Sequence, residues 1–121
     1  MANIFLDANY FIGLVNRIPE IEIETLEGHR GFVSTLSCHL LFYINKEKVP
    51  NKKLGSFIDD FHLTALTPEI IETSLDGPTS DLEDNIQLHS AAEAECDYFL
   101  TLDQKLLSMK FFGKTKIADQ I

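Results

Sequence analysis

The sequence predicts an α/β fold: a three-layer α/β/α arrangement around a central, mainly parallel sheet of about five strands. The first observation is that strand-like and helix-like segments alternate along the chain, which is typical of parallel strands joined by helices. The second is that residues 3–7 (NIFLD) form an almost wholly apolar run, as in a strand covered on both faces. No repeat, linker or low-complexity tract interrupts the 121 residues, so residues 1–121 are expected to form a single domain.

The first half of the chain predicts two strand–helix units. A helix at 9–16 is expected to follow the 3–7 strand. Segment 17–30 contains a proline and four glutamates, and it is predicted as either an acidic helix or a loop. Residues 31–35 are predicted as the next strand and residues 36–48 as its helix. The apolar face of that helix carries Leu36, Leu40, Tyr43 and Ile44.

The middle of the chain predicts three short elements and a turn. Pro50 and Asn51 open a helix that is expected to end near residue 61. Residues 62–66 are a strand candidate, and Pro68 starts another short helix. The composition of residues 75–79 (LDGPT) is that of a turn.

The last third of the chain predicts a long helix, a strand and a short helix. Ser80 and Glu83 have the spacing of a capping box, so a helix is expected to start here and continue to about residue 95. A strand at 98–102 and a helix at 104–110 follow. Residues 115–118 are predicted as a final strand at an edge of the sheet.

The net charge of −9 restricts how this chain can meet nucleic acid. A protein that holds nucleic acid by surface charge alone is expected to be basic. The partner is therefore basic, or nucleic acid is held through a bound metal and a small basic patch, or nucleic acid is not a partner. The excess of acids also has a plainer role, which is solubility. No apolar stretch approaches the roughly 18 residues of a membrane span, and no basic leader is visible, so we expect a cytoplasmic protein without a membrane partner.

Three aspartates are predicted to meet at one edge of the sheet. The helix from Asp84 to residue 95 rises about 16 Å, and the strand that leads to Asp103 returns about 16 Å, so Asp103 is expected close to Asp84. Asp7 reaches the same edge if the 3–7 and 98–102 strands are parallel neighbours. Three carboxylates suit a hard divalent cation such as Mg²⁺ or Mn²⁺, which indicates metal-assisted phosphoryl chemistry.

Four other polar residues are candidates for accessory roles at this edge. Asp81, one turn before Asp84, either lines the same mouth or supplies favourable charge to the helix N-terminus. Asn9 either orients a water or phosphate oxygen or caps the first helix. Ser34 and Thr101 stand at strand ends, where their hydroxyls add hydrogen bonds.

These motifs resemble those of the PIN domain, a family of metal-dependent ribonucleases. The matching segments are FLDAN (5–9), Ser34 and Thr35 before a helix, DLED (81–84) opening a helix that continues through Ala91 and Ala92, and YFLTLD (98–103). The resemblance implies a parallel sheet between helices and a Mg²⁺ or Mn²⁺ site at Asp7, Asp84 and Asp103. Many members are toxins of toxin–antitoxin pairs, often dimeric, which cut RNA until a small antitoxin protein blocks them. The expected partners are therefore an RNA substrate, an antitoxin and a second copy of the chain.

The sequence departs from the family at one position. Members usually carry a glutamate on the helix after the second strand, and here Leu40 stands there with His39 beside it. Two functions are compatible with this departure: a ribonuclease that works with three acids, or a catalytically impaired domain that binds protein or RNA. In the ribonuclease, His39 is expected to lie near the pocket. Other α/β enzymes fit less well, because Asn9 stands where a dehalogenase-type phosphatase has its second aspartate and no glycine-rich phosphate loop is present.

Overall fold

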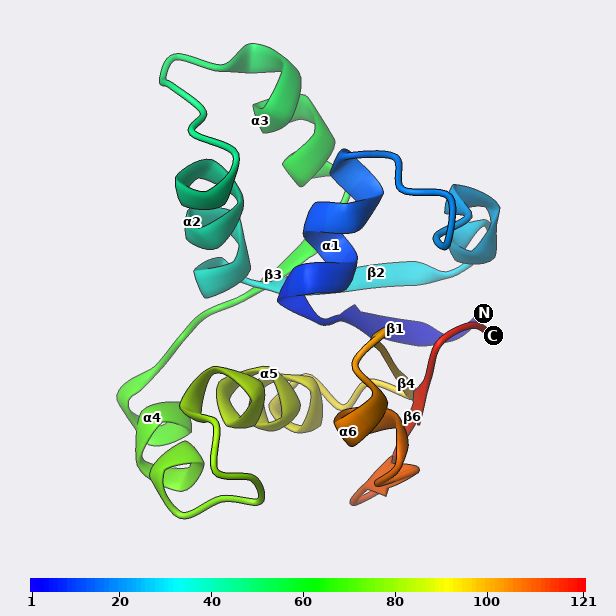
Figure 1. The fold of residues 1–121 in the computed structure, drawn as a ribbon, viewed down its shortest axis with the longest axis vertical. Helices are drawn as coiled ribbons and strands as arrows, with labels where there is room; N and C mark the ends of the chain where they lie inside the picture. Colours follow the sequence, from blue (N-terminus) through cyan, green and yellow to red (C-terminus); the bar gives the residue numbers. More distant parts are fainter.

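The computed structural model describes all of residues 1–121 and has an α/β architecture around one six-stranded sheet, in the order β3-β2-β1-β4-β6-β5 (Figure 1). Every neighbouring pair is parallel except β5 and β6. The strands are β1 (Asn3–Leu6), β2 (Arg30–Ser34), β3 (His62–Thr64), β4 (Tyr98–Leu100), β5 (Phe111–Phe112) and β6 (Thr115–Ala118). The predicted α/β class and mainly parallel sheet are confirmed, with six strands in place of about five.

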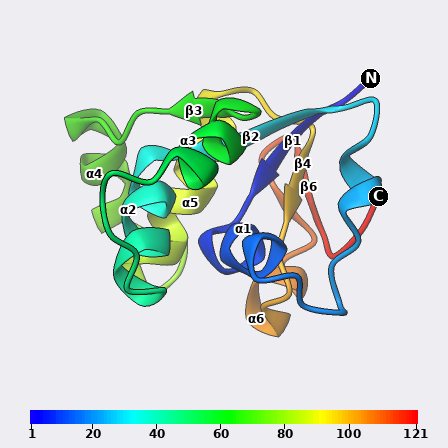
Figure 2. The ribbon, with the colours of Figure 1, turned by 90° about the horizontal axis from the view of Figure 1, so that it is seen from above.

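Helices cover both sides of this sheet. Figure 1 shows α1, α2 and α3 on one side and α4, α5 and α6 on the other. Their bounds are α1 (Ala8–Val15), α2 (Thr35–Ile44), α3 (Lys52–Asp59), α4 (Pro68–Leu75), α5 (Leu82–Glu93) and α6 (Gln104–Leu107). Figure 2, turned by 90°, shows β1, β4 and β6 side by side. None of the helices is both long enough and apolar enough to cross a membrane.

Two hydrophobic clusters separated by the sheet explain why β1 is apolar on both faces. Ile4 and Leu6 point into the cluster beneath α1, α2 and α3, whereas Phe5 points into the cluster beneath α5 and α6. Phe5 stacks there on Phe99 of the neighbouring strand β4, with ring centroids 5.7 Å apart. Strand β1 is therefore fixed between both layers, and so is the residue that follows it, Asp7.

Two of the expected caps are corrected by the structure. Helix α5 is capped by Asp81, whose carboxylate accepts a hydrogen bond from the Asp84 backbone N–H at 3.0 Å, and not by a box of Ser80 and Glu83. Helix α1 is capped by Asp7 and begins at residue 8, so Asn9 is not its cap. In both cases the capping aspartate is the last non-helical residue, where its side chain can reach an unpaired N–H of the first turn.

Residues 17–29 form a loop with one 3₁₀ turn, η1 (Ile23–Leu26), so the loop is the predicted alternative that holds. One segment near the end of the chain differs from expectation. Helix α6 ends at Leu107, not near residue 110, and the chain then forms β5, which the sequence did not predict. Because β5 pairs with β6, residues 115–118 lie inside the sheet and not at its edge.

Candidate functional site

The carboxyl ends of β1 and β4 meet at the centre of the sheet. The two strands are parallel neighbours with Leu6 opposite Leu100, and the Asp7 N–H donates to the Leu100 carbonyl at 3.0 Å. Asp7 thus stands directly beside the segment that leads from β4 to Asp103. Polar groups at carboxyl ends of adjacent parallel strands are a common setting for ligand sites in α/β folds.

Thr101 links two of the three aspartates. Its hydroxyl donates to Asp7 Oδ2 at 2.9 Å and accepts from the Asp103 backbone N–H at 3.0 Å. Asp7 Oδ1 accepts from the Ala8 N–H at 2.8 Å, so both oxygens of this 3% exposed carboxylate are oriented. Thr101, predicted as an accessory residue, therefore lies at the site and fixes the orientation of Asp7.

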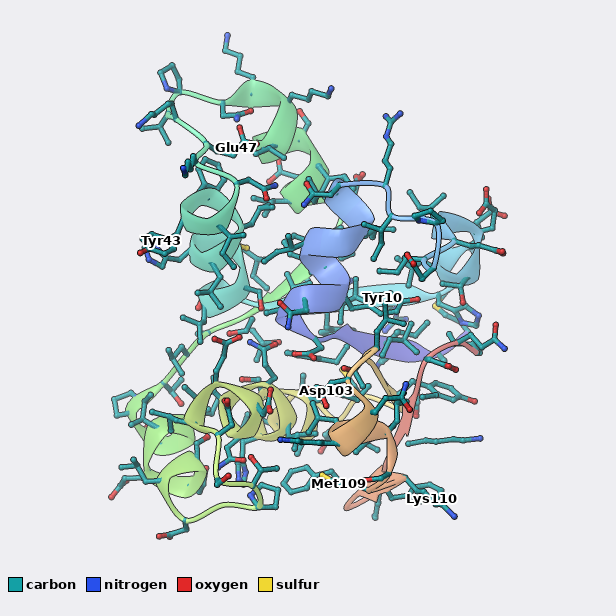
Figure 3. All side chains as sticks on the ribbon, in the orientation of Figure 1. Tyr10, Tyr43, Glu47, Asp103, Met109 and Lys110 are labelled. Carbon is teal, nitrogen blue, oxygen red and sulfur yellow. The ribbon has the colours of Figure 1, made fainter.

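Asp84 and Asp103 stand at the starts of helices that converge on Asp7. Asp84 lies in the first turn of α5, is partly exposed, and its carboxylate makes no hydrogen bond within the protein. Asp103 caps α6 through Oδ1, which accepts from the backbone N–H groups of Lys105 at 2.8 Å and Leu106 at 3.3 Å. Figure 3 shows Asp103 in the middle of the molecule, between the β1–α1 corner and α5.

The protonation of these acids shows that they act on one another. The pKa of Asp7 is raised to about 7, first by burial and then by the charge of Asp84, against the lowering effect of the hydrogen bond from Thr101. Burial raises the pKa of Asp84 to about 6, helped by the charges of Asp81 and Asp103 and opposed by Lys105. The charge of Asp84 thus raises the pKa of Asp7, and the charge of Asp103 raises the pKa of Asp84, so the three predicted acids are linked through Asp84.

Glu83 also belongs to this group, although its spacing from Ser80 in the sequence indicated only a capping residue. Burial and the charge of Asp81 raise the pKa of Glu83, and its own charge raises the pKa values of Asp7 and Asp84. The charged group is therefore Asp7, Glu83, Asp84 and Asp103, with Asp81 beside it. A signal for Glu83 existed in the sequence, since it adjoins Asp84 in the same first helical turn.

A buried polar pair joins the two helical layers behind Asp84. Gln87, one turn further along α5, exchanges hydrogen bonds with Ser37 of α2 at 3.1 and 3.3 Å, and both side chains are fully buried. The pair connects the first turn of α2 to the second turn of α5. The position of Asp84 is thereby coupled to α2 on the opposite side of the sheet.

Asn85 anchors the loop that precedes α5. Its amide group donates to the carbonyls of Ser74 and Thr79 at 2.8 and 2.9 Å, and its Oδ1 accepts from the Thr79 N–H and hydroxyl at 2.9 and 2.6 Å. One buried side chain thus holds the end of α4, the 75–80 turn and the start of α5 together. The first turn of α5, with Glu83 and Asp84, is fixed by this network.

Asn85→Ala is expected to destabilise the protein by about 2–4 kcal/mol, because it leaves several buried polar groups unpaired. Chemical denaturation measures the change. Asn45→Ala is the control: the Asn45 side chain exchanges hydrogen bonds only with exposed Asn16, so the expected loss is about 1 kcal/mol or less. Equal losses in the two variants would contradict the role given to Asn85.

The remaining accessory candidates lie as follows. Asn9 is exposed in the first turn of α1, two residues from Asp7. Ser34 is buried and caps α2, its hydroxyl accepting from the Leu36 N–H at 3.1 Å. His39 is exposed and stacks on Tyr43, which Figure 3 shows on the outer side of α2, away from Asp103. The structure therefore does not bring His39 to the carboxylates.

The side chains as they stand do not form a closed metal site. No three of the His, Cys, Asp or Glu side chains are close enough together to hold a metal ion. The chemistry of the donors nevertheless fits a hard cation: all are carboxylates, both Asp84 oxygens and Asp103 Oδ2 have no hydrogen-bond partner, and the group repels itself. Cation binding would draw these side chains together.

No protein-family model matches this chain, and no curated protein is significantly similar to it in sequence.

Proposed function

We propose that this chain is a divalent-metal-dependent endoribonuclease with a PIN-like fold, similar to the toxin components of toxin–antitoxin systems. The observation that carries the proposal is the placement of three aspartates. Asp7 and Asp103 follow the carboxyl ends of β1 and β4 and are linked by the Thr101 hydroxyl, and Asp84 in the first turn of α5 is near enough that its charge raises the pKa of Asp7. The six-stranded, mainly parallel sheet with helices on both sides is compatible with that family. A small antitoxin protein and a second copy of the chain are proposed partners.

Asp7, Asp84 and Asp103 would hold a Mg²⁺ or Mn²⁺ ion, directly or through water. Such an ion lowers the pKa of a bound water and neutralises charge that develops on a phosphate during hydrolysis. In the reaction, water adds to phosphorus and one ester P–O bond breaks, leaving a phosphate monoester and a hydroxyl. The cation also explains how a chain with net charge −9 can hold RNA at an acidic site.

The protein groups around the acids have positioning roles. Thr101 holds the Asp7 carboxylate in one orientation through its hydroxyl. Lys105 is exposed and close enough to Asp84 to lower its pKa, so its ammonium can contact a phosphate of the substrate at the mouth. Asn9, exposed beside Asp7, can hydrogen-bond a water or a phosphate oxygen.

The experiment that tests this function is cleavage of a single-stranded RNA by the purified protein with Mg²⁺ or Mn²⁺, and with EDTA as control. Metal-dependent cutting is expected. A folded protein that cuts nothing with either metal would contradict the nuclease and favour the second candidate, an impaired PIN-like module that binds protein or RNA. Leu40 favours that second candidate, because it is half-buried against the core where the family has a glutamate and cannot bind a cation.

Glu83→Gln tests whether Glu83 supplies the fourth carboxylate. Removing its charge is expected to weaken the apparent affinity for Mn²⁺ by about tenfold, since a nearby charge that supports a metal site has effects of this order. The concentration of Mn²⁺ at half-maximal cleavage measures it. Glu72→Gln, an exposed change on α4, is the control and should leave this concentration unchanged. An unaltered Mn²⁺ dependence in Glu83→Gln would show that three carboxylates suffice.

A further inference from the structure

A row of three side chains crosses the sheet at β4, β6 and β5. Tyr98 of β4 is opposite Lys116 of β6, and Lys116 is opposite Phe111 of β5. Residues directly opposite each other on neighbouring strands project from the same face of a sheet. Tyr98, Lys116 and Phe111 therefore lie side by side on one face, with the lysine between two aromatic rings; we call them the aromatic row.

On this face Phe111 and Lys116 are open to solvent, whereas Tyr98 is half-buried and packs against the cluster beneath α1, α2 and α3. The strand neighbours of the row, Phe99 and Ile117, point the other way into the cluster beneath α5 and α6. Phe112 also points that way and meets the His89 ring edge-on at 5.0 Å. On the opposite face Phe111 is 57% exposed, Lys116 is exposed and Tyr98 is half-buried. Single exposed aromatics are common on protein surfaces, but two in one register row with a lysine form a continuous surface.

The segment that carries β5 and β6 has a charge opposite to that of the rest of the chain. Residues 104–118 contain four lysines and no acid, whereas the remaining residues contain six basic and nineteen acidic ones. All four lysines, at 105, 110, 114 and 116, are exposed. Lys110 directly precedes β5, and Figure 3 shows it at the lower right of the molecule, beside the β5–β6 hairpin. Lys114 lines a cleft together with two acids, Glu95 and Asp97. We therefore assign only Lys110 and Lys116 to the row as groups that can contact a phosphate.

The tight hairpin fixes this arrangement. Gly113 and Lys114 connect β5 to β6, and Gly113 has φ of +60°, which a residue with a side chain rarely adopts. The Ile117 N–H donates to the Lys110 carbonyl at 2.9 Å and ties the base of the hairpin to β6. Phe111 and Lys116 are thus held on a rigid element and need little reordering to bind a ligand.

We propose that the aromatic row binds single-stranded RNA, with bases stacking on Phe111 and Tyr98 and phosphates contacting Lys110 and Lys116. Aromatic rings on an open sheet face, interleaved with lysines, suit unpaired bases and their backbone and tolerate any sequence. The chain from Tyr98 of β4 to Asp103 spans at most about 16 Å, so RNA on the row is within a few nucleotides of the carboxylates. The choice of RNA as ligand rests on the proposed function, whereas binding to the row needs no metal.

Binding of a fluorescently labelled oligouridylate of about 12 nucleotides, measured by anisotropy in EDTA, tests the row without cleavage. Phe111→Ala is expected to weaken binding about tenfold, the effect of losing one stacked base. Tyr43→Ala removes an aromatic ring that is 74% exposed on α2 and should bind as the wild type does. Thermal unfolding confirms that both variants are folded, as expected for exposed side chains.

Lys116→Gln tests whether the Lys116 side chain contacts a phosphate of the RNA. It should reduce the slope of log affinity against log salt by about 0.7, the value for one phosphate contact on a single strand. Lys52→Gln, an exposed lysine on α3, should leave the slope unchanged. No binding by the wild-type protein at low salt, or equal affinities of wild type and Phe111→Ala, would overturn the proposal.

The outcomes separate this inference from the nuclease. Loss of binding in Phe111→Ala without any metal-dependent cleavage supports the row and contradicts the nuclease. Cleavage with the same KM in wild type and Phe111→Ala supports the nuclease and overturns the row. If the aromatic row binds RNA and the chain is also a nuclease, Phe111→Ala raises KM about tenfold and leaves kcat unchanged. The reason is that the row contacts RNA away from the reacting phosphate.

Discussion

Asp84→Asn is expected to lower metal-dependent RNA cleavage by at least about 100-fold, because among the three proposed metal ligands Asp84 is the one whose carboxylate makes no hydrogen bond within the protein. The fold should be retained, since the backbone N–H of Asp84 and not its side chain completes the helix cap. Loss of the negative charge also relieves repulsion with Asp81 and Asp103, so the variant should be at least as stable as the wild type in the absence of metal. Single-turnover cleavage of a labelled single-stranded RNA in Mn²⁺ measures the activity.

Glu93→Gln is the matched control for this variant. Glu93 ends the same helix and is exposed, so its loss should change neither cleavage nor stability. Both proteins are purified in the same way, which reveals any contaminating ribonuclease as activity common to both. Cleavage by Asp84→Asn at the wild-type rate would contradict the assignment of Asp84.

Asp7→Asn is expected to stabilise the protein at pH 8 by up to about 4 kcal/mol while removing its activity. The pKa of Asp7 is about 7 in the folded protein against a usual 3.8. Between these values the folded state binds more protons than the unfolded state, so the free energy of unfolding falls as pH rises from about 4 to about 7 and then levels off. Asparagine carries no charge to bury and keeps the hydrogen bond from the Ala8 N–H.

The pH dependence of the stability gain distinguishes removal of the buried Asp7 charge from a general effect of the substitution on stability. The gain in Asp7→Asn should be largest above pH 7 and should nearly vanish at pH 4, where Asp7 is protonated in the folded protein. Urea denaturation at the two pH values measures it, with Asp59→Asn, an exposed change at the end of α3, as control. If Asp7→Asn is less stable than the wild type at pH 8, the hydrogen bonds to the ionised Asp7 offset the cost of burying its charge.

The sequence predicts most of the fold because the local signals agree with one another. The apolar run before Asp7, the helix that starts at Asp84 and the strand that leads to Asp103 are each recognisable alone. The approach of Asp103 to Asp84 follows from lengths, because the extended chain from residue 98 to 103 returns roughly as far as the helix from Asp84 to its end advances. Strand β5 gave no signal because its two residues are too few for a periodic pattern.

The contacts that complete the site depend on tertiary structure, which is why the sequence did not predict them. Whether Ser80 or Asp81 caps α5 depends on the backbone conformation of the 75–80 turn, which Asn85 fixes through groups on α4. The Ser37–Gln87 pair joins residues that are 50 positions apart. His39 is exposed because Leu41 and the other apolar side chains of α2 face the core and set the orientation of the helix.

The most direct test of the metal centre is thermal unfolding in a titration with Mn²⁺ at pH 8 and at pH 5. Binding to the folded state alone raises the unfolding temperature with metal concentration. We expect this rise in the wild type, larger at pH 8 than at pH 5 because Asp7 and Asp84 must be ionised to bind, and no rise in Asp84→Asn. An unfolding temperature that does not respond to Mn²⁺ at pH 8, or that rises equally in Asp84→Asn, would contradict a metal site at these carboxylates.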